Sequence, residues 1–455
     1  MNEFRNKNIL VMGLGRSGYA SACFLSGMGA IVTVTDTAEE EKLLSFSKAL
    51  REKGIHLEMG GHCNDTVEGS DMIVISPGVP HTLEPLRIAQ KKGIPVIGEI
   101  ELAARFIHEP MIAITGTNGK TTTTKLISAM IEASGFSVFT GGNIGTPLIE
   151  YVSSSKKVDR VVVEVSSFQL DTIQQFRPHV SVLLNITEDH LDRYDGFESY
   201  AESKAKIFQN QENTDFAVLN RADKSIQRLA ASSRATNLFF DSRGEQENTA
   251  IINCEKIYLP RLMGDEGHIV DPSETTLVGK HNQENIAASA LATLAAGGNI
   301  EGIRSALKSF KGLPHRLEYV ATVGQVRYID DSKATNVDAV LRALEVFDGK
   351  VILIMGGLDK GGEYGVLKDQ LLEKVRLILV LGEARRIIQK SLGGYTEITE
   401  VSSMADAVSM AHERSIPGDT VLLSPACSSF DMFDSYAHRG DVFCQAVRKI
   451  QEKHL

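Results

Sequence analysis

The chain has 455 residues, more than one hydrophobic core accommodates, and this length indicates about three domains. Hydrophobic residues make up 42% of the chain and charged residues 23%, and the net charge is −10. This balance is typical of a globular protein, and it excludes a broad basic surface for nucleic acid or for an anionic membrane.

Neither the cysteines nor the N-terminus indicates an exported or metal-stabilised protein. The five cysteines are scattered, with no C-x-x-C pair, which predicts reduced thiols in a cytoplasmic protein and no zinc or disulfide framework. The first residues lead directly into a strand-like run, and no apolar run approaches about 18 residues. We therefore expect no signal peptide and no insertion into a membrane.

Strand-like and helix-like segments alternate along the chain, which predicts α/β layers with largely parallel sheets. In the first predicted domain, residues 1–98, an apolar run precedes G-x-G-x-x-G at Gly13, Gly15 and Gly18, and Asp36 follows a second apolar run. This order is typical of a dinucleotide-binding turn with its acidic ribose partner, and it raises the possibility of an NAD enzyme. The predicted strands are Ile9–Met12, Ile31–Val34, Met72–Ile75 and Pro95–Ile97.

The second predicted domain, residues 99–312, opens with a phosphate-loop pattern, AITGTNGKTTTT. A strand ending at Thr115 leads into a tight glycine loop, and Lys120 and Thr121 then begin a helix. Backbone N–H groups at a helix N-terminus bind phosphate, a lysine there reaches the β- and γ-phosphates, and the next hydroxyl holds Mg²⁺. Only two residues separate Gly116 from Gly119, where the general phosphate loop has four. The alternative is a glycine-rich turn that only caps a helix.

Acidic residues follow two further apolar runs of this domain. Glu164 lies at the end of the first run, and Asp189, His190 and Asp192 follow the second. Open α/β sheets bind ligands at the carboxyl ends of their strands, and carboxylates are ligands for Mg²⁺. The convergence favours a Mg-ATP site, whereas Glu164 taken alone is equally compatible with a solvated strand face.

The alternation continues through the rest of the chain. Residues 237–269 show short alternating runs that predict strands or surface loops, and HNQENIAASALATLAAGG predicts a long helix. The third predicted domain, residues 313–455, again alternates strands and helices. The strands expected in the second and third domains are Val161–Val165, Val180–Leu184, Phe216–Leu219, Val326–Ile329, Val351–Met355, Leu377–Leu381 and Thr420–Leu423.

Motifs of one family occur in order along the chain: TGTNGKTTT, GGNIG, EVSSFQL, NITEDHLDRY, YAESKAKIF, GKHNQENIAAS, GLPHRLE, DDSKATN and LSPACSSFDMF. On these motifs the chain resembles the Mur ligase family over essentially its whole length. The resemblance implies a Rossmann-like N-terminal domain, a central P-loop-type ATPase domain and a Rossmann-like C-terminal domain. DDSKATN and SPACSSFDMF point to the members that add D-glutamate.

The activity implied by the resemblance is a cytoplasmic, ATP-dependent ligation in bacterial peptidoglycan synthesis, and thus in cell shape and division. The carboxylate of UDP-N-acetylmuramoyl-L-alanine attacks the γ-phosphate of ATP, and the amine of D-glutamate then displaces phosphate from the acyl phosphate. The implied cofactors are ATP and two Mg²⁺ ions. The implied partners are these small molecules, without nucleic acid, and the implied protein is a monomer.

The resemblance also assigns residues to this chemistry. The implied catalytic residues are Lys120, Glu164, His190 and Lys204, and Lys204 would be carbamylated. Thr121, Glu164, His190 and Lys204 would serve the Mg²⁺ ions. From the residues alone, Lys204 indicates a solvated helix lysine, and HNQEN a capping cluster at a helix start. The residues implied for ATP are Gly116, Thr117, Asn118, Gly119, Lys120, Thr121, Thr122, Asn282, Asn285, Arg316, Asp331 and Lys333.

Two further sets are implied for the other substrates. The set for the UDP substrate is Gly15, Ser17, Asp36, Thr37, Gly78, Asn143 and His190. The set for D-glutamate is Thr335, Lys360, Ser429 and Phe430, in a pocket expected to be cationic and rich in hydroxyl groups; from the residues alone, Lys360 indicates a surface loop. The chain departs from the family at Ala38, often an arginine, at Leu358, usually an aspartate that Asp359 would replace, and at Tyr436, a phenylalanine.

Four other functions compete with this interpretation. A dehydrogenase built on the first domain leaves the Gly-Lys-Thr loop unexplained, and a phosphate-loop switch or transport ATPase has no use for DDSKATN and SPACSSF. Folylpolyglutamate synthetases share the loop but do not need such an N-terminal domain. A Mur ligase that adds a different amino acid is the nearest alternative. On the ligase interpretation, the first glycine loop binds the diphosphate of a UDP-sugar and not of NAD.

Overall fold

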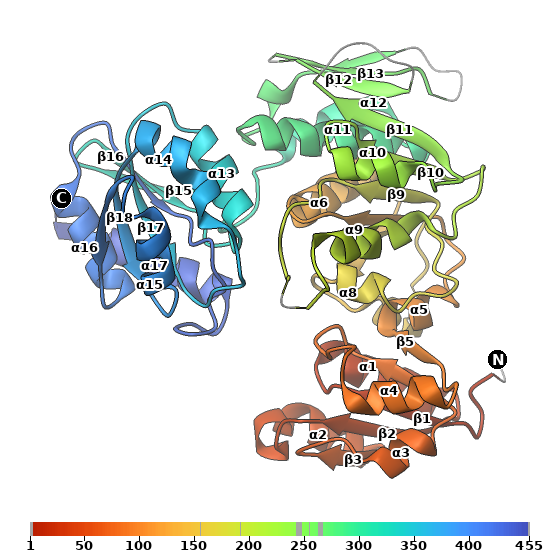
Figure 1. Ribbon diagram of the computed structural model, residues 1–455. Helices are drawn as coiled ribbons and strands as arrows, with labels where there is room; N and C mark the ends of the chain where they lie inside the picture. The colour runs from red at the N-terminus through yellow and green to blue at the C-terminus, as the bar shows by residue number, and fades with distance from the viewer. Residues whose placement is uncertain are drawn as a thin grey trace. The chain divides into compact units, whose positions relative to one another are not determined.

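The computed structural model describes residues 3–154, 156–191, 193–242, 248–253, 255–262 and 267–453. Three α/β sheets follow one another along the chain (Figure 1), which confirms the predicted class. Unit 1 consists of Met1–Ile186, Glu198–Asp271 and Asn285–Lys308, and unit 2 of Thr187–Phe197, Pro272–Glu284 and Ser309–Leu455. Within the described ranges, no helix is both long and apolar enough to cross a bilayer.

The first sheet, in unit 1, is parallel throughout and has the order β3-β2-β1-β4-β5. The chain reverses its direction of travel across the sheet at β1, so the ligand crevice of such a fold lies beyond the carboxyl end of β1. The sequence did not predict β3, because HLEM lacks an apolar run. The elements are β1 Asn8–Met12, α1 Arg16–Gly27, β2 Ile31–Asp36, α2 Leu44–Glu52, β3 His56–Met59, α3 Asn64–Glu68, β4 Met72–Ile75, α4 Glu84–Lys91, β5 Val96–Gly98 and α5 Glu99–Ala104.

The second sheet has the order β14-β13-β12-β11-β10-β9-β6-β8-β7, in which β13 runs antiparallel to both β12 and β14 and the remaining strand pairs are parallel. The described part of 237–269 thus supplies strands at one edge of this sheet. The strands are β6 Met111–Thr115, β7 Val138–Gly142, β8 Arg160–Glu164, β9 Val180–Leu183, β10 Phe216–Asn220, β11 Thr236–Asp241, β12 Thr249–Ile252, β13 Ile257–Leu259 and β14 His268–Val270. The helices are α6 Lys120–Ala133, α7 Leu148–Ser153, α8 Ser167–Leu170, α9 Phe197–Ala205, α10 Lys224–Ala230, α11 Lys280–Ala295 and α12 Ile300–Ser309.

The third sheet, in unit 2, has the order β15-β16-β20-β17-β18-β19. It is parallel except for β15, which pairs with β16 through a tight turn at Gly324 and Gln325, both with positive φ. The strands are β15 Glu318–Val323, β16 Val326–Asp330, β17 Val351–Gly356, β18 Val375–Leu381, β19 Glu397–Glu400 and β20 Thr420–Leu423. The helices are α13 Val337–Glu345, α14 Lys368–Lys374, α15 Arg385–Leu392, α16 Met404–Arg414 and α17 Tyr436–Lys453.

Alternate residues of β17 pack into two separate cores. Leu353 belongs to the core that includes residues of α13, α14 and α15. Ile352 and Ile354 belong to the core that includes residues of α16 and α17. Burial on both faces of the sheet explains why the strand reads as one unbroken apolar run.

A buried arginine joins the loops at the carboxyl ends of this sheet. Arg439, in α17, is only 1% exposed. Its guanidinium donates to Ser332 Oγ at 3.0 Å, to the carbonyl of Cys427 at 3.1 Å and to the carbonyls of Ser428 and Gly356. Burial lowers the pKa of Arg439 to about 10, so it remains charged at neutral pH. One side chain therefore holds the loops that follow β16, β17 and β20.

A buried glutamate at the start of α5 makes stability depend on pH. Glu99 Oε1 accepts a hydrogen bond from Ile149 N at 2.7 Å, and burial raises the pKa of Glu99 to about 7. The folded state therefore binds the proton more tightly than the unfolded state. Its stability falls as the pH rises from about 4.5 through about 7.

Replacing the Glu99 carboxyl with a neutral amide should remove this loss of stability at high pH. Glu99→Gln keeps the acceptor for Ile149 N, and we expect its stability relative to wild type to increase by about 2 kcal/mol between pH 5.5 and pH 8. Any constant penalty for burying the amide cancels in this comparison. Thermal unfolding at the two pH values measures it, and Glu132→Gln, on the exposed side of α6, is the matched control. An equal shift at both pH values would contradict the assignment.

Candidate functional site

The predicted phosphate loop connects β6 to α6 in unit 1. Gly119 precedes the helix with φ +87°, and a Cβ there would lie 2.4 Å from Asn285 Oδ1, so the position requires glycine. Lys120 Nζ folds over the loop and donates to the carbonyls of Gly116 and Thr117, both at 2.8 Å. Loop, lysine and helix N-terminus lie together in the order that the sequence predicted, and this arrangement suits an anion.

An asparagine that the sequence analysis did not single out shapes this loop. Asn185 follows β9, the neighbour of β6 in the sheet. Its Oδ1 accepts from Asn118 N at 2.8 Å, its Nδ2 donates to Asn118 O at 3.1 Å, and its own carbonyl accepts from Thr117 N at 2.9 Å. The position of Asn185 after an apolar strand, on the same sheet edge as the loop, was the signal for it.

The buried carboxylate of Glu164 lies on the same edge. Glu164 ends β8 and pairs in register with Ile114 of β6, one residue before the end of that strand. It is 2% exposed, which rules out the solvated strand face. Its Oε1 accepts from Asn143 Nδ2 at 3.0 Å, whereas Oε2 is buried without a hydrogen-bond partner among the described residues. A buried carboxylate oxygen in this state suits a cation.

Lys204 is buried as well, and is therefore not a solvated helix lysine. It lies in α9 and is 2% exposed. Its Nζ donates to the carbonyl of Gly116 at 2.9 Å and lies 4.5 Å from the centre of the Tyr200 ring. The Tyr200 hydroxyl in turn lies 3.2 Å from Thr117 Oγ1. The structure therefore brings Lys204 directly against the phosphate loop.

A pocket of about 530 Å³ opens beside the first glycine loop. Asp36 holds this loop in place, because its Oδ2 accepts from Leu14 N at 2.6 Å and its Oδ1 from Ala38 N at 2.8 Å. Asn143 and His190, which the sequence also assigned to the UDP substrate, are not among the lining residues. Five of the assigned residues do line the pocket: Gly15, Ser17, Asp36, Thr37 and Gly78. The sequence analysis assigned no role to His62, which also lines it.

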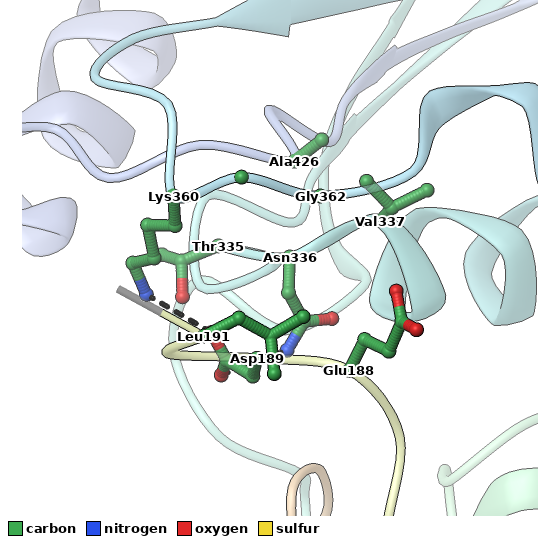
Figure 2. A pocket seen from close by; sticks show the side chains of 10 residues that line it. Glu188, Asp189, Leu191, Thr335, Asn336, Val337, Lys360, Gly362 and Ala426 are labelled. Atoms are coloured by element: carbon green, nitrogen blue, oxygen red, sulfur yellow. Dashed lines mark hydrogen bonds and ion pairs between the residues drawn. The ribbon is translucent and has the colours of Figure 1, made fainter. Parts of the chain in front are cut away.

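A second, small pocket in unit 2 contains part of the predicted D-glutamate set (Figure 2). Thr335 and Lys360 line it together with Glu188, Asp189 and Asn336. Lys360 Nζ lies 3.7 Å from Asp189 Oδ1. The pocket is therefore not only cationic and hydroxyl-rich, as the sequence predicted, because two carboxylates face it as well. Carboxylates in that place suit an ammonium group.

The structure does not bring the rest of that set to this pocket. Ser429 and Phe430 are not among its lining residues, and Phe430 is 72% exposed. His190 has φ +56°, and its backbone N–H donates to Asp189 Oδ1 at 3.0 Å, so it lies beside the pocket. Asp192, which the sequence grouped with these two residues, lies outside the described residues.

The loop that carries Lys360 is fixed by a buried tyrosine. Tyr364 is 2% exposed, and its hydroxyl donates to Asp359 Oδ1 at 2.7 Å and lies 3.1 Å from Cys427 Sγ. Backbone hydrogen bonds in both directions between Leu358 and Ser428, each at 3.0 Å, join this loop to the loop after β20. Asp359 thus has a structural role directly before Lys360.

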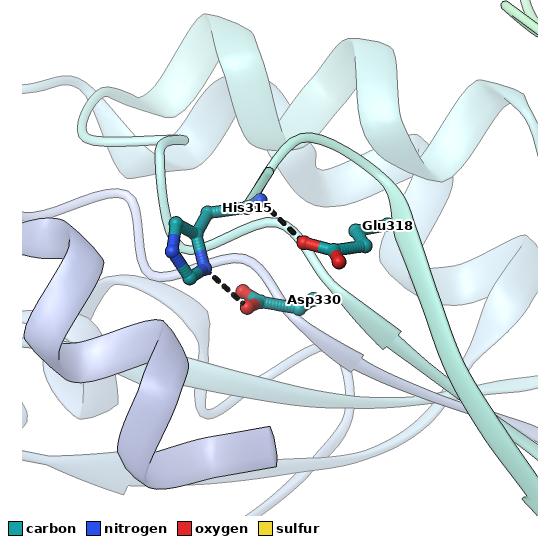
Figure 3. Close-up of side chains that lie close together, drawn as sticks. All are labelled: His315, Glu318 and Asp330. Atoms are coloured by element: carbon teal, nitrogen blue, oxygen red, sulfur yellow. Dashed lines mark hydrogen bonds and ion pairs between the residues drawn. The ribbon is translucent and has the colours of Figure 1, made fainter. Parts of the chain in front are cut away.

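Arg316 lies in a tight turn of unit 2, between two residues with positive φ, His315 and Leu317. Figure 3 shows what holds the turn: His315 N donates to Glu318 Oε2, and its Nδ1 lies beside Asp330 Oδ2, both at 2.7 Å. The three side chains offer atoms within 4.8 Å of one another, as in a cation site. All three already form the hydrogen bonds that hold this turn, so we infer that they position Arg316 and do not bind a cation.

The other residues predicted to contact the nucleotide from unit 2 lie near this turn or on α11. Asp331 accepts from Leu317 N at 3.3 Å and from Ser424 Oγ at 2.9 Å, and burial raises the pKa of Asp331 to about 7. Lys333 Nζ lies 3.9 Å from the centre of the Tyr436 ring. Asn282, in α11, donates to the carbonyl of Val278 at 2.7 Å.

Models of protein families match most of the chain. The Mur ligase MurD-like N-terminal domain matches residues 7–98, the Mur ligase middle domain residues 114–293 and the Mur ligase glutamate ligase domain residues 315–427. The UDP-N-acetylmuramoylalanine–D-glutamate ligase of Desulfosudis oleivorans is 50% identical over 450 residues, which cover 99% of this chain and 98% of that protein.

Two further comparisons agree with these matches. The protein of the same name from Desulfatibacillum aliphaticivorans is 49% identical over 449 residues, 98% of this chain and 99% of that one. The MurF ligase of Thermotoga maritima, solved in complex with ADP, has a TM-score of 0.61 at 18% identity and covers 100% of this chain and 97% of its own. At that identity the likeness shows the fold alone.

Proposed function

The chain belongs to the Mur ligase family, and we propose that it uses ATP to join D-glutamate to UDP-N-acetylmuramoyl-L-alanine in peptidoglycan precursor synthesis. The observation that carries the proposal is the sheet edge of unit 1, where Lys120, Lys204 and Glu164 follow or flank the phosphate loop. The full-length similarity to ligases of that name supports the choice of D-glutamate.

The phosphate loop would bind the phosphates of ATP. Lys120 now donates to loop carbonyls, and its ammonium would turn to the β- and γ-phosphates when they are present. The other predicted contacts in unit 1 are Gly116, Thr117, Asn118, Gly119, Thr121, Thr122 and Asn285. Unit 2 would contribute Asn282, Arg316, Asp331 and Lys333, of which Arg316 presents a guanidinium for phosphate oxygens.

The residues of unit 1 also fit Mg²⁺. Oε2 of Glu164, which is buried and has no hydrogen-bond partner in the described part of the chain, is the kind of oxygen ligand that Mg²⁺ takes, and the Thr121 hydroxyl is a second. For a second ion we propose a carbamylated Lys204 of unit 1 and His190, which belongs to unit 2. When bound, Mg²⁺ neutralises charge on the phosphates during transfer.

The chain's own residues account for the remaining steps. The substrate carboxylate attacks the γ-phosphorus, and the bond from that phosphorus to the β-γ bridging oxygen breaks, which leaves ADP and an acyl phosphate. Lys120 stabilises the charge on the transferring oxygens. The amine of D-glutamate then attacks the acyl carbon, loses a proton and expels phosphate. Asn143 would orient the muramoyl part, because Glu164 holds its side chain in place.

The D-glutamate would bind in unit 2. Lys360 and Thr335 would bind its carboxylates, with Ser429 and Phe430 completing the predicted set. The carboxylates of Glu188 and Asp189 in the same pocket would accept hydrogen bonds from its ammonium group. We place the reaction in the cytoplasm, where reduced cysteines are expected, and propose a monomer.

Phosphate release measured with a panel of amino acids, here called the amino-acid panel, tests this function most directly. Purified protein with ATP, Mg²⁺ and UDP-N-acetylmuramoyl-L-alanine should release phosphate when D-glutamate is added. L-alanine, a diamino acid and D-alanyl-D-alanine should each give less than about a hundredth of that rate. Release that depends on one of these and ignores D-glutamate would identify a different Mur ligase and overturn the proposal.

A further inference from the structure

His62 lines the pocket beside the first glycine loop, three residues beyond the end of β3. Two backbone hydrogen bonds join its loop to the loop after β2. Gly61 N donates to the carbonyl of Asp36 at 3.0 Å, and Gly60 N donates to the carbonyl of Ala38 at 3.1 Å. The imidazole is therefore held on the same edge of the sheet as Asp36.

The hydrogen bonds of Thr35 fix the tautomer of His62. Thr35 Oγ1 lies 2.7 Å from the carbonyl of Gly61 and 3.0 Å from His62 Nδ1. A carbonyl oxygen only accepts, so the single hydroxyl proton belongs to that bond. Nδ1 must then carry a hydrogen and donate it to Thr35 Oγ1.

The other ring nitrogen is consequently an acceptor. Burial lowers the pKa of His62 although Asp36 opposes the shift, so the ring is neutral at pH 7. A neutral ring with its hydrogen on Nδ1 has a lone pair on Nε2. No described residue makes a hydrogen bond to Nε2, so this lone pair is available to a ligand in the pocket.

The strand order indicates which part of the ligand His62 meets. A diphosphate binds at the N-terminus of α1, directly after β1. Asp36 ends β2, the next strand, and His62 follows β3, the strand beyond it. Neighbouring strands lie about 4.8 Å apart. A nucleotide laid along this edge thus passes from its phosphates through its ribose to its base.

We propose that Nε2 of His62 accepts a hydrogen bond from N3–H of uracil and thereby selects a uridine nucleotide. Uracil has one donor on this edge, N3–H, between two carbonyl groups. Cytosine has an unprotonated N3 in the same place, which would set two lone pairs against each other. The inference rests on the proposed function for the identity of the substrate, but it concerns binding of the nucleotide alone.

Isothermal titration calorimetry of the full chain measures its affinity for three free nucleotides, and it tests the inference without any turnover. Wild-type protein should bind uridine diphosphate at least about tenfold more tightly than cytidine diphosphate or N3-methyluridine diphosphate. His62→Phe keeps a ring of similar size without the nitrogens, and should bind all three within about threefold of one another. Thr35→Val removes the hydroxyl that holds the hydrogen on His62 Nδ1, so either tautomer can form, and the preference for uridine diphosphate should fall only in part. His56→Phe, on the exposed side of β3, is the matched control and should retain it.

The outcomes separate this inference from its alternatives. Wild-type preference retained in His62→Phe would overturn it, provided that thermal unfolding shows the variant to be folded. A preference for uridine diphosphate over its 2′-deoxy form that disappears in His62→Phe, while discrimination against N3-methyluridine remains, would overturn it in favour of a ribose contact. Loss of base discrimination in His62→Phe supports the inference even if the amino-acid panel shows no ligation.

Discussion

Replacing Lys120 with alanine is expected to lower kcat for ligation by about 10³-fold or more. Lys120 is the first residue of α6, and its ammonium lies over the loop between β6 and α6, where Lys204 also contacts the carbonyl of Gly116. Phosphoryl transfer depends on neutralising charge that develops on the transferring oxygens, so the loss falls on the chemical step. ATP binding should weaken far less, because the backbone N–H groups and the helix N-terminus remain.

Phosphate release and ATP titration together measure this split between kcat and affinity. Lys125→Ala is the matched control, since Lys125 lies five residues further along α6 and is exposed. Lys120 also bonds two loop carbonyls, so the fold of the variant must be verified by circular dichroism and thermal unfolding. A correctly folded Lys120→Ala variant with activity within tenfold of wild type would remove Lys120 from the catalytic step.

Replacing Lys204 with alanine should reduce activity by about 100-fold or more, and a short-chain carboxylic acid should restore part of it. Carbamylation joins the amine of Lys204 to CO₂, releases a proton and creates a carboxylate-like group that suits a hard cation. The buried position against Gly116 removes the ordinary explanation of a surface lysine. A free acid in the vacated space would supply the missing oxygens.

Rate measurements across a series of formate, acetate and propionate concentrations provide the readout. Lys206→Ala is the matched control, because Lys206 lies two residues away and forms an ion pair with Asp171 at 2.7 Å. This control should keep nearly full activity with or without added acid. Unchanged activity in Lys204→Ala would eliminate the carbamate, and a loss that no acid restores would leave Lys204 with a packing role only.

The parts of the site that could be predicted from the sequence are those at the ends of apolar strands and at the starts of helices. Lys120 follows an apolar strand and a glycine turn and begins a helix, so its position could be predicted from the sequence. Glu164 could be placed on the same edge because parallel strands end together. The sequence could not predict that its Oε2 has no hydrogen-bond partner among the described residues. The long apolar strands were predicted for the same reason, whereas β3, β7 and β19 are short and mixed in character.

The residues that sequence reasoning missed depend on loops from different strands meeting in space. Asn185 contacts Asn118 only because β9 lies beside β6. His62 acquires its orientation from Thr35, which is one strand away. Periodicity carries no information about such pairings. The same limit explains why Phe430, a member of the predicted D-glutamate set, is exposed and does not line that pocket.

The position of Arg439 in the chain has a consequence for synthesis. The guanidinium that holds the loops after β16, β17 and β20 lies in the last helix, so a ribosome completes nearly the whole polypeptide before those loops have their common anchor. Until then the segment that carries Lys360 lacks its final support. A nascent chain of this protein can make these hydrogen bonds only after α17 has been synthesised. Premature termination before α17 would therefore remove the anchor of these three loops, which all belong to unit 2, and leave the residues of the phosphate loop in unit 1 unchanged.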